Sequence, residues 1–316
     1  MLTEDIPIVI LPRQQITREE FTARFPHGSV ALDGVVRGGP FIDKATLHAN
    51  FDHHEEVMRS ATMSTSMQAY FAIKGRFCER RNGKFTIVVN DPDQDTSLAA
   101  WLLRNWKRFS GVQSHPTIGR LLTLTDRLDV TAGAFPMSLD DQLLRVHSWV
   151  FKPYTDARKS GDLARGGEAT MRSIMLAVFS NLNDLMLGRG GEQELDTRYE
   201  ILYASPKHGF EIVDEIGGNE ARCHLFSLGH LWRGYVSIVA RKPDGRIVYT
   251  VGKPSEHVEF PAPEIRDALN AAEGLSRANG WNGSDIVFGS SREGSVMPWT
   301  QVRDVVESVL DARENR

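Results

Sequence analysis

Two short stretches of the chain concentrate side chains that bind divalent cations. The sequence ANFDHHEEV, residues 49–57, places Asp52, His53 and His54 side by side. The sequence NDPDQD, residues 90–95, carries three aspartates within five positions. Carboxylate oxygen is the ligand that Mg²⁺ and Mn²⁺ prefer, and imidazole shifts the preference toward Mn²⁺ or a similar transition metal. The two stretches therefore predict a metal site rich in oxygen ligands.

Further aspartates lie at Asp33 and in the sequence LTDRLD, residues 124–129. Two metal ions held about 4 Å apart need shared carboxylates to offset their mutual repulsion, and an acid-rich site supplies them. The clusters that could supply metal ligands are Asp33 alone, then Asp52 with His53 and His54, then Asp91 with Asp93 and Asp95, and finally Asp126 with Asp129.

The elements that would position these residues alternate between strand and helix. Apolar runs predict strands at residues 6–11, 29–32 and 85–89, and Thr17 with Glu20 predicts a capped helix start. Further helices are expected at 64–74, after NDPDQD, at 117–129 and at 139–150. This alternation predicts an α/β fold with a mainly parallel sheet. Ligands bind at the carboxyl ends of such strands, where Asp33 and the aspartates of 91–95 would meet.

Each cluster also has an ordinary structural explanation. An aspartate after a strand is commonly a turn or N-cap residue, which would account for Asp33 alone and equally well for NDPDQD. Asp126 and Asp129 are individually better explained by an exposed helix face. DHH is more specific, and the prediction of a metal site depends on the clusters taken together.

The stretch VALDGVVRGGPFIDKATLHANFDHHEEV, residues 30–57, resembles the DHH phosphoesterase superfamily, including its MYG-type members. That superfamily also includes RecJ-type nucleases, nano-RNases, cyclic-dinucleotide phosphodiesterases and family II pyrophosphatases. VVNDPDQDTSLAAWLL, residues 88–103, and LTDRLD are similar to two further motifs, so the resemblance covers roughly residues 28 to 132. It implies a parallel-sheet catalytic domain that holds two Mn²⁺ ions, with Mg²⁺ as an alternative.

The resemblance also implies a role for each residue. Asp33 would bridge both ions, His53 would bind the second ion, and Asp52 would orient the histidine pair. His54 would face the substrate phosphate or the leaving group, which makes Asp52 and His54 the candidate catalytic residues. The remaining implied ligands are Asp93 for the first ion, Asp95 for the second, and Asp126, or else Asp129, to complete the second site.

Two departures from the family pattern leave other functions open. NDPDQD follows DHH instead of preceding it, so the motif order is permuted. Val89 stands where the family usually has a metal-binding histidine, and Asp91 or Asn90 would have to substitute. One rival function is therefore a degenerate module that binds a nucleotide or metal without turnover. The other is hydrolysis of pyrophosphate or polyphosphate.

The sequence GRGGE, residues 188–192, interrupts a helical pattern and marks the expected domain boundary. The predicted organisation is a DHH-like metal-binding domain at 1–155, a helical linker at 156–192, and a smaller α+β substrate-binding domain at 193–316. In the last domain we expect strands at 199–203, 235–240 and 246–251, with Asp244 and Gly245 as the hairpin turn between the latter two. Helices are expected at 262–275 and 298–313.

A glycine-rich loop at residues 281–295, WNGSDIVFGSSREGS, is the candidate substrate-binding segment. Its glycines allow close approach to a phosphate, and Ser290, Ser291 and Arg292 supply donors. Lys253 follows a predicted strand and could also reach an anion. An ordinary surface loop and a solvated lysine are the alternatives.

Composition limits the partners of the chain. Its net charge is −4 over 316 residues, which argues against sequence-independent binding to long nucleic acid. We expect a small phosphorylated substrate, such as a nucleotide derivative or a short single-stranded oligonucleotide. The two cysteines, Cys78 and Cys223, are far apart in the sequence, and no apolar run approaches 18 residues. The expectation is a cytoplasmic protein without membrane contact, and the sequence does not predict its oligomeric state.

Overall fold

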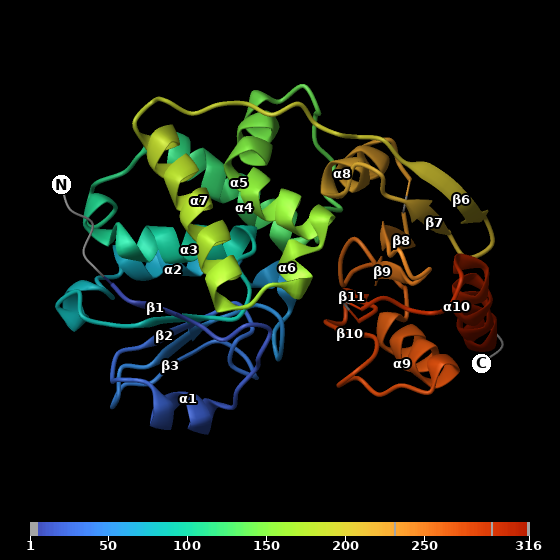
Figure 1. Ribbon diagram of the computed structural model, residues 1–316, viewed down its shortest axis with the longest axis horizontal. Helices are drawn as coiled ribbons and strands as arrows, with labels where there is room; N and C mark the ends of the chain where they lie inside the picture. Colours follow the sequence, from blue (N-terminus) through green and yellow to red (C-terminus); the bar gives the residue numbers. More distant parts are fainter. Residues whose placement is uncertain (1–5, 231, 292, 315–316) are drawn as a thin grey trace. The chain divides into compact units, whose positions relative to one another are not determined.

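A computed structural model describes residues 6–230, 232–291 and 293–314 (Figure 1). The chain forms two compact units, each of which is built from two stretches of sequence. The first unit comprises Met1–Val130 and Asp140–Glu194, and the second comprises Thr131–Leu139 and Leu195–Arg316. The α/β class predicted from the sequence is confirmed.

The first unit contains a five-stranded sheet in the order β1-β5-β2-β4-β3. Neighbouring strands are parallel, except that β3 runs antiparallel to β4. The strands are β1 (Ile8–Ile10), β2 (Val30–Leu32), β3 (Phe41–Ile42), β4 (Ala49–Phe51) and β5 (Ile87–Val89). Side chains alternate between the two faces of the sheet. Val30 and Leu32 join the large core formed with the helices, whereas Ala31 packs with Phe21 on the opposite face.

Helices cover both faces of this sheet (Figure 1). Helix α1 (Arg18–Arg24) covers one face and begins with the predicted capping box between Thr17 and Glu20. The helices on the other side are α2 (Thr65–Lys74), α3 (Gln94–Arg104), α4 (Pro116–Val130), α5 (Gln142–Ser160), α6 (Asp162–Arg165) and α7 (Glu168–Met186). Short 3₁₀ turns occur at η1 (Arg59–Ala61), η2 (Glu79–Arg81) and η3 (Trp106–Arg108).

The two units do not coincide with the predicted division into a domain at 1–155, a linker at 156–192 and a second domain at 193–316. Helix α5 runs through position 155, and the expected linker folds as α6 and α7 within the first unit. The physical reason is burial, because α7 places Met171, Val178 and Leu182 in the same core as Leu98 of α3. An element that buries this much apolar surface belongs to the core that it completes.

The second unit contains a six-stranded sheet in the order β10-β11-β9-β8-β7-β6. Only the pairing of β7 with β8 is parallel among the described strands of this sheet. The strands are β6 (Glu200–Ser205), β7 (Phe210–Asp214), β8 (Gly234–Arg241), β9 (Ile247–Gly252), β10 (Asn282–Gly283) and β11 (Val287–Gly289). The predicted hairpin between β8 and β9 is confirmed, and Gly245 adopts a φ of +88° in its turn.

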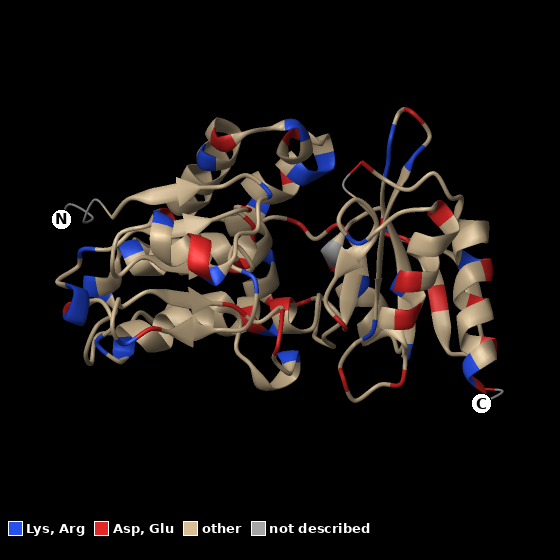
Figure 2. Ribbon diagram, turned by 90° about the horizontal axis from the view of Figure 1, so that it is seen from below, with Lys and Arg blue, Asp and Glu red and all other residues tan. Residues whose placement is uncertain are grey.

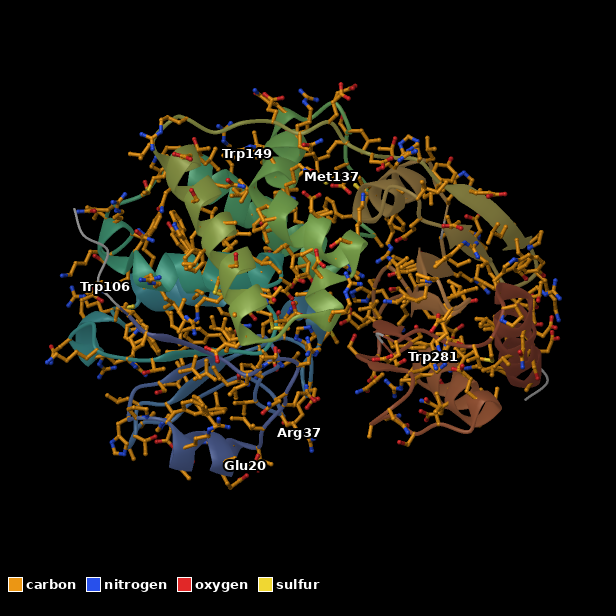
Figure 3. The ribbon with its side chains drawn as sticks, in the orientation of Figure 1. Glu20, Arg37, Trp106, Met137, Trp149 and Trp281 are labelled. Carbon is orange, nitrogen blue, oxygen red and sulfur yellow. The ribbon has the colours of Figure 1, made fainter. Side chains whose placement is uncertain are left out.

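Helices α8 (Asn219–Ser227), α9 (Ala262–Glu273) and α10 (Trp299–Glu314) complete the second unit. Trp281 lies inside it (Figure 3). The Trp281 ring stacks on that of Tyr249, with ring centroids 5.6 Å apart. Acidic and basic residues are interspersed over both units (Figure 2). In the described residues, no helix combines the length and apolar character that a membrane span requires.

The segment Thr131–Leu139 belongs to the second unit because α8 holds it there. Arg222 donates from Nη1 to the carbonyl of Ala132 at 2.8 Å, and its Nε and Nη2 form a buried ion pair with Glu215 at 2.6 and 2.9 Å. Cys223 Sγ donates to the carbonyl of Phe135 at 3.4 Å. These contacts satisfy main-chain carbonyls of a segment that has no strand or helix of its own.

Candidate metal centre

Asp33 is the first residue after β2, and two threonines hold its side chain. Its φ of +56° lies in the left-handed region, which aspartate tolerates better than most residues. Thr65 Oγ1 donates to Asp33 Oδ1 at 3.1 Å, and Thr96 Oγ1 donates to Asp33 Oδ2 at 3.0 Å. The two threonines lie in α2 and α3. The first turns of two helices therefore fix this carboxylate at the end of the strand.

The DHH sequence forms the loop after β4, and Asp52 organises it. Asp52 Oδ1 accepts hydrogen bonds from the main-chain N–H groups of His53 at 2.7 Å and His54 at 3.1 Å. The same oxygen lies 2.8 Å from Nδ1 of the His54 ring. Asp52 thus contacts His54 through its ring and His53 through its main chain. The His53 side chain is fully buried, whereas that of His54 is 35% exposed.

Asp93 and Asp95 come from the first turn of α3. Asp93 is the N-cap residue, and its Oδ1 accepts a hydrogen bond from Thr96 N at 2.8 Å. The N-cap explanation for this stretch is therefore correct for Asp93. Burial raises the pKa of Asp93, and the nearby charge of Asp33 raises it further. Asp95 Oδ1 accepts a hydrogen bond from Ser66 N at 3.0 Å.

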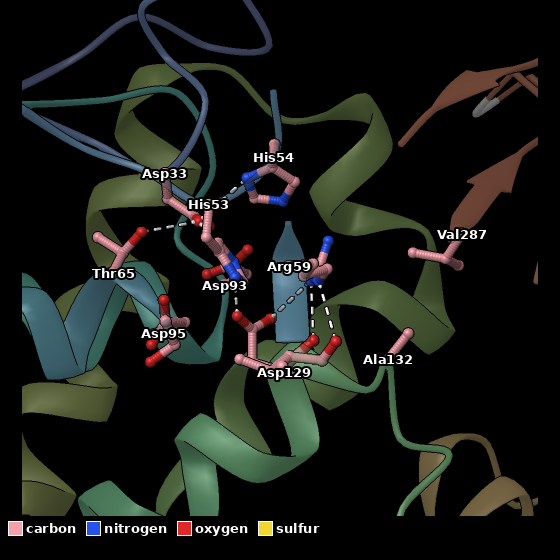
Figure 4. Close-up of polar contacts among 12 residues, drawn as sticks. Asp33, His53, His54, Arg59, Thr65, Asp93, Asp95, Asp129, Ala132 and Val287 are labelled. Carbon is pink, nitrogen blue, oxygen red and sulfur yellow. Dashed lines mark hydrogen bonds and ion pairs between the residues drawn. The ribbon is translucent and has the colours of Figure 1, made fainter. Parts of the chain in front are cut away.

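Asp129, rather than Asp126, reaches the cluster from α4. Asp129 Oδ2 lies 2.7 Å from His53 Nε2 (Figure 4). Asp126 Oδ1 instead accepts a hydrogen bond from Ser64 N at 2.8 Å, just ahead of α2. The expected order of preference between the two is therefore reversed, because the phase of α4 directs only Asp129 toward His53.

Ligand atoms from Asp33, His53, Asp95 and Asp129 come together although the residues lie on four separate segments (Figure 4). Together with His54 they form two overlapping groups, Asp33 with His53 and His54, and His53 with Asp95 and Asp129. Within each group the candidate ligand atoms lie within 4.8 Å of one another. Both groups could hold a metal ion, and His53 is common to them.

The electrostatics of the cluster favour a bound cation. Burial raises the pKa of Asp33 well above its usual range, and the charges of Asp95 and Asp129 raise it further. Burial and then the charge of Asp129 raise the pKa of Asp95 to about 8. The pKa of Asp93 is also raised well above its usual range, by burial and then by Asp33. Several carboxylates therefore repel one another here, and positive charge would relieve the repulsion.

His53 and Asp129 have the protonation states that metal ligands need. Burial lowers the pKa of His53 to about 4, so its imidazole is neutral at pH 7. Burial opposes ionisation of Asp129, but its contact with His53 and the charge of Arg59 hold its pKa below the usual range. A neutral imidazole and an ionised carboxylate are the forms that bind metal.

Several buried atoms of the cluster make no hydrogen bond to the described residues. Among them are His53 Nδ1, Asp95 Oδ2, Asp129 Oδ2 and His53 Nε2. The latter two are 2.7 Å apart but lack the alignment of a hydrogen bond. Neighbouring ligands of one octahedral ion with bonds of about 2.1 Å would lie roughly 3 Å apart. The donor set and its unsatisfied atoms therefore fit a divalent cation.

Residues 89–91 lie at the margin of the cluster or outside it. Asp91 is half-buried, and its charge raises the pKa of Asp93. Val89 is buried in the hydrophobic core and offers no ligand atom. Asn90 donates from Nδ2 to the carbonyls of Gln14 at 3.0 Å and Gly34 at 3.3 Å, so it anchors the loop after Asp33.

The candidate substrate-binding residues belong to the second unit. Lys253 Nζ donates to the carbonyl of Val258 at 3.1 Å. Ser290 Oγ accepts a hydrogen bond from Tyr249 N at 3.0 Å and donates to the carbonyl of Ser291 at 3.3 Å. Ser291 Oγ donates to the carbonyl of Gly294 at 3.5 Å. Arg292 lies outside the described residues. The hydroxyl groups of Ser290 and Ser291 therefore donate to main-chain carbonyls of their own loop.

Thr65, Thr96 and Arg59 contact the cluster but were not predicted from the sequence. Ser64, the N-cap of α2, and Asp93, the N-cap of α3, are signals that place the two threonines in first turns, and first turns lie at the carboxyl edge of a parallel sheet. Arg59 has no such signal, because its role depends on a contact with the distant end of α4.

A third group of potential ligands, His208 with Asp311 and Glu314, lies in the second unit. Lys207 pairs there with Asp311, and also with Glu314 at 3.3 Å. Because a lysine already compensates these carboxylates, the group is best described as an ion-pair network that ties the β6–β7 turn to α10.

No family model, curated protein or solved structure matches this chain.

Proposed function

We propose that this protein is a metal-dependent phosphoesterase of the DHH type, with the first unit as its catalytic domain. The observation that carries the proposal is the convergence of Asp33, His53, Asp95 and Asp129 on one buried cluster from four segments. Hydrolytic two-metal sites have this composition, with carboxylates in excess and no thiolate.

The metals would be two Mn²⁺ ions, with Mg²⁺ as the alternative. One ion would use Asp33 and Asp93, and the other would use His53, Asp95 and Asp129, with Asp33 shared between them. When bound, the ions would neutralise the non-bridging phosphoryl oxygens and lower the pKa of water. The raised pKa values of Asp33, Asp93 and Asp95 support this assignment, because a bound cation would favour the ionised form of each of these carboxylates.

His54 is the proposed proton carrier for the leaving group. Its Nδ1 lies 2.8 Å from Asp52 Oδ1, and a carboxylate at that distance fixes Nδ1 as the protonated nitrogen. Nε2 is then the nitrogen that can exchange a proton with substrate, and the side chain is exposed enough to meet one. Asp52 also accepts hydrogen bonds from the main-chain N–H groups of both histidines, so it orients the loop and the His54 ring.

The proposed substrate is a small phosphodiester, namely a nucleotide derivative or a short single-stranded oligonucleotide. The negative net charge and the interspersed surface charges disfavour a long polyanionic partner. Lys253, Ser290, Ser291 and Arg292 remain the proposed contacts of the second unit with substrate.

One observation favours a second candidate function, a module that binds metal and nucleotide without turnover. The family position for a metal-binding histidine is Val89, which is buried in the core, so the first ion would have one ligand fewer. If the first ion were held weakly, hydrolysis would be reduced, but the binding of nucleotide and of the second ion would remain.

The test combines Mn²⁺ binding by calorimetry with hydrolysis of a panel of phosphodiesters, oligonucleotides and pyrophosphate. Wild type should bind Mn²⁺ and hydrolyse at least one phosphodiester, and Asp33→Asn and His53→Ala should abolish hydrolysis. Asp156→Asn and His27→Ala are matched controls at exposed positions of the first unit. Binding without hydrolysis of any substrate would favour the second candidate, and hydrolysis of pyrophosphate alone would favour a phosphoanhydride hydrolase. Absence of Mn²⁺ and Mg²⁺ binding would refute the proposal.

A further inference from the structure

Arg59 is a buried arginine that holds the C-terminal end of α4. It lies in the 3₁₀ turn η1, six positions after His53, and its side chain is only 7% exposed. Nη2 donates to the carbonyl of Asp129 at 2.8 Å, and Nε donates to the carbonyl of Val130 at 3.2 Å. The last carbonyls of a helix have no partner within the helix, so Arg59 satisfies two groups that would otherwise be costly to bury.

The same guanidinium also lies beside the Asp129 side chain. Arg59 Nη2 is 3.6 Å from Asp129 Oδ1, whereas Asp129 Oδ2 is the atom that lies 2.7 Å from His53 Nε2 (Figure 4). The two carboxylate oxygens therefore have different neighbours. Arg59 occupies one side of the group and leaves a single oxygen for the cluster.

We propose that Arg59 is a positioning residue for the metal ligand Asp129. It fixes the main chain at the end of α4 and turns the carboxylate so that Oδ2 meets His53. This inference rests on the proposed metal site and adds a requirement to it, because an arginine outside the ligand set would control how well the ligand set binds.

The direction in which Mn²⁺ affinity changes when Arg59 is replaced distinguishes a positioning role from that of a nearby charge. A cation beside a ligand repels a divalent ion, so an arginine that was only a nearby charge would weaken Mn²⁺ binding, and its removal would tighten it. A residue that orients a ligand has the opposite effect. Loss of such an orienting partner typically weakens metal affinity by about 10–100-fold.

The experiment measures the dissociation constant for Mn²⁺ by calorimetry in wild type, Arg59→Met, Arg59→Lys, Asp129→Asn and the double variant Arg59→Met/Asp129→Asn. Arg59→Met should weaken binding about tenfold or more. Arg59→Lys keeps the charge but loses the planar fork, so its loss should be smaller yet measurable. In the Asp129→Asn background, Arg59→Met should cause little further loss, because the two changes act on one interaction.

Arg81→Met is the matched control. Arg81 is also buried, and it donates to the carbonyls of Gly28 at 3.2 Å, Phe77 at 3.1 Å and Leu47. It should lose stability and keep its Mn²⁺ affinity. Circular dichroism establishes whether each variant is folded. If Arg59→Met does not fold, the Mn²⁺ affinity of Arg59→Lys is the deciding measurement.

Unchanged or tighter Mn²⁺ binding in the folded Arg59 variants would overturn the positioning role and leave the metal site standing. Fully additive losses in the double variant would also overturn it. If wild type binds no Mn²⁺, the proposed function fails first and the role of Arg59 fails with it.

Discussion

His53 Nε2 lies 2.7 Å from Asp129 Oδ2, and this contact joins the loop after β4 to the last turn of α4. The imidazole is neutral and the carboxylate ionised, so the pair carries a net negative charge. Asp33 and Asp95 lie beside it. Without metal, a cluster of this kind should lower the stability of the protein. Substituting its residues, changing the pH or adding a metal ion should therefore change the free energy of unfolding measurably.

The stability of the metal-free protein should depend on pH in an unusual direction. The pKa of Asp95 is raised to about 8, so the folded state keeps a proton that the unfolded state has lost. Stability therefore falls as pH rises through this range. His53 opposes this trend only below its unfolded pKa of about 6.5. Between about pH 6.5 and 8, the free energy of unfolding should fall by up to about 1.4 kcal/mol per pH unit for each such proton.

Denaturant unfolding in a chelator, measured across that pH window, tests this dependence. Asp95→Asn should flatten the slope, while Asp156→Asn, a change at an exposed site, should leave it as in wild type. A slope that rises with pH in wild type would contradict the electrostatics of the cluster.

Asp33→Asn should have opposite effects on stability and on metal binding. The asparagine removes a buried carboxyl group whose ionisation is opposed by burial and by the charges of Asp95 and Asp129, and it retains an acceptor for Thr65 or Thr96. In a chelator the variant should melt higher than wild type, by about 2–4 °C for each kcal/mol gained. With Mn²⁺ present the order should reverse, because only wild type gains binding energy. A lower melting temperature in both conditions would indicate that Asp33 is structural.

Substitutions of Asp126 and Asp129 should have different effects on stability and on Mn²⁺ affinity, although both residues lie in LTDRLD. Asp126→Ala removes the acceptor of the Ser64 N–H group and should cost about 1 kcal/mol of stability, with Mn²⁺ affinity unchanged. Asp129→Asn should weaken Mn²⁺ binding strongly. Parallel calorimetric and thermal titrations of the two variants measure both quantities. Equal loss of Mn²⁺ affinity in both would show that Asp126 also binds metal.

His54→Ala should reduce turnover more than metal affinity. A positioned general acid contributes about 10²–10⁴-fold to rate, and the partly exposed ring of His54 lies at the edge of the cluster. The expected result is a fall in kcat with a Mn²⁺ dissociation constant close to that of wild type. Asp52→Asn should show a weaker version of the same pattern. A substrate with an acidic leaving group should restore the rate of His54→Ala, and failure to restore it would assign His54 another role.

In the first unit, β1, β2 and β5 were predictable from local sequence, whereas β3 and β4 lie in a stretch that was expected to be a loop. Runs such as IPIVIL and FTIVV are apolar and rich in β-branched residues, and parallel strands place the residues that follow them at one edge. Strand pattern alone is therefore enough to bring Asp33 near NDPDQD. The choice between Asp126 and Asp129 was not predictable, because it depends on the rotation of α4 about its axis.

Two other features depend on contacts between distant segments. Arg59 meets the end of α4 only because the 3₁₀ turn after DHH packs there, and no local pattern encodes that. The helices at 142–186 were expected to end one domain and to link it to the next. Their burial against α3 is a property of the whole core and not of their own periodicity.

The Thr131–Leu139 segment makes both units discontinuous in sequence, and this limits how the protein can be dissected. A fragment that begins at 195 would lack the main-chain acceptors that Ala132 and Phe135 offer to Arg222 and Cys223. The buried Arg222 would then face Glu215 with one donor unsatisfied. During synthesis, α4 and this segment are also translated long before the strands of the second unit against which the segment packs. The second unit therefore cannot complete its fold until its early segment and its late strands are both present.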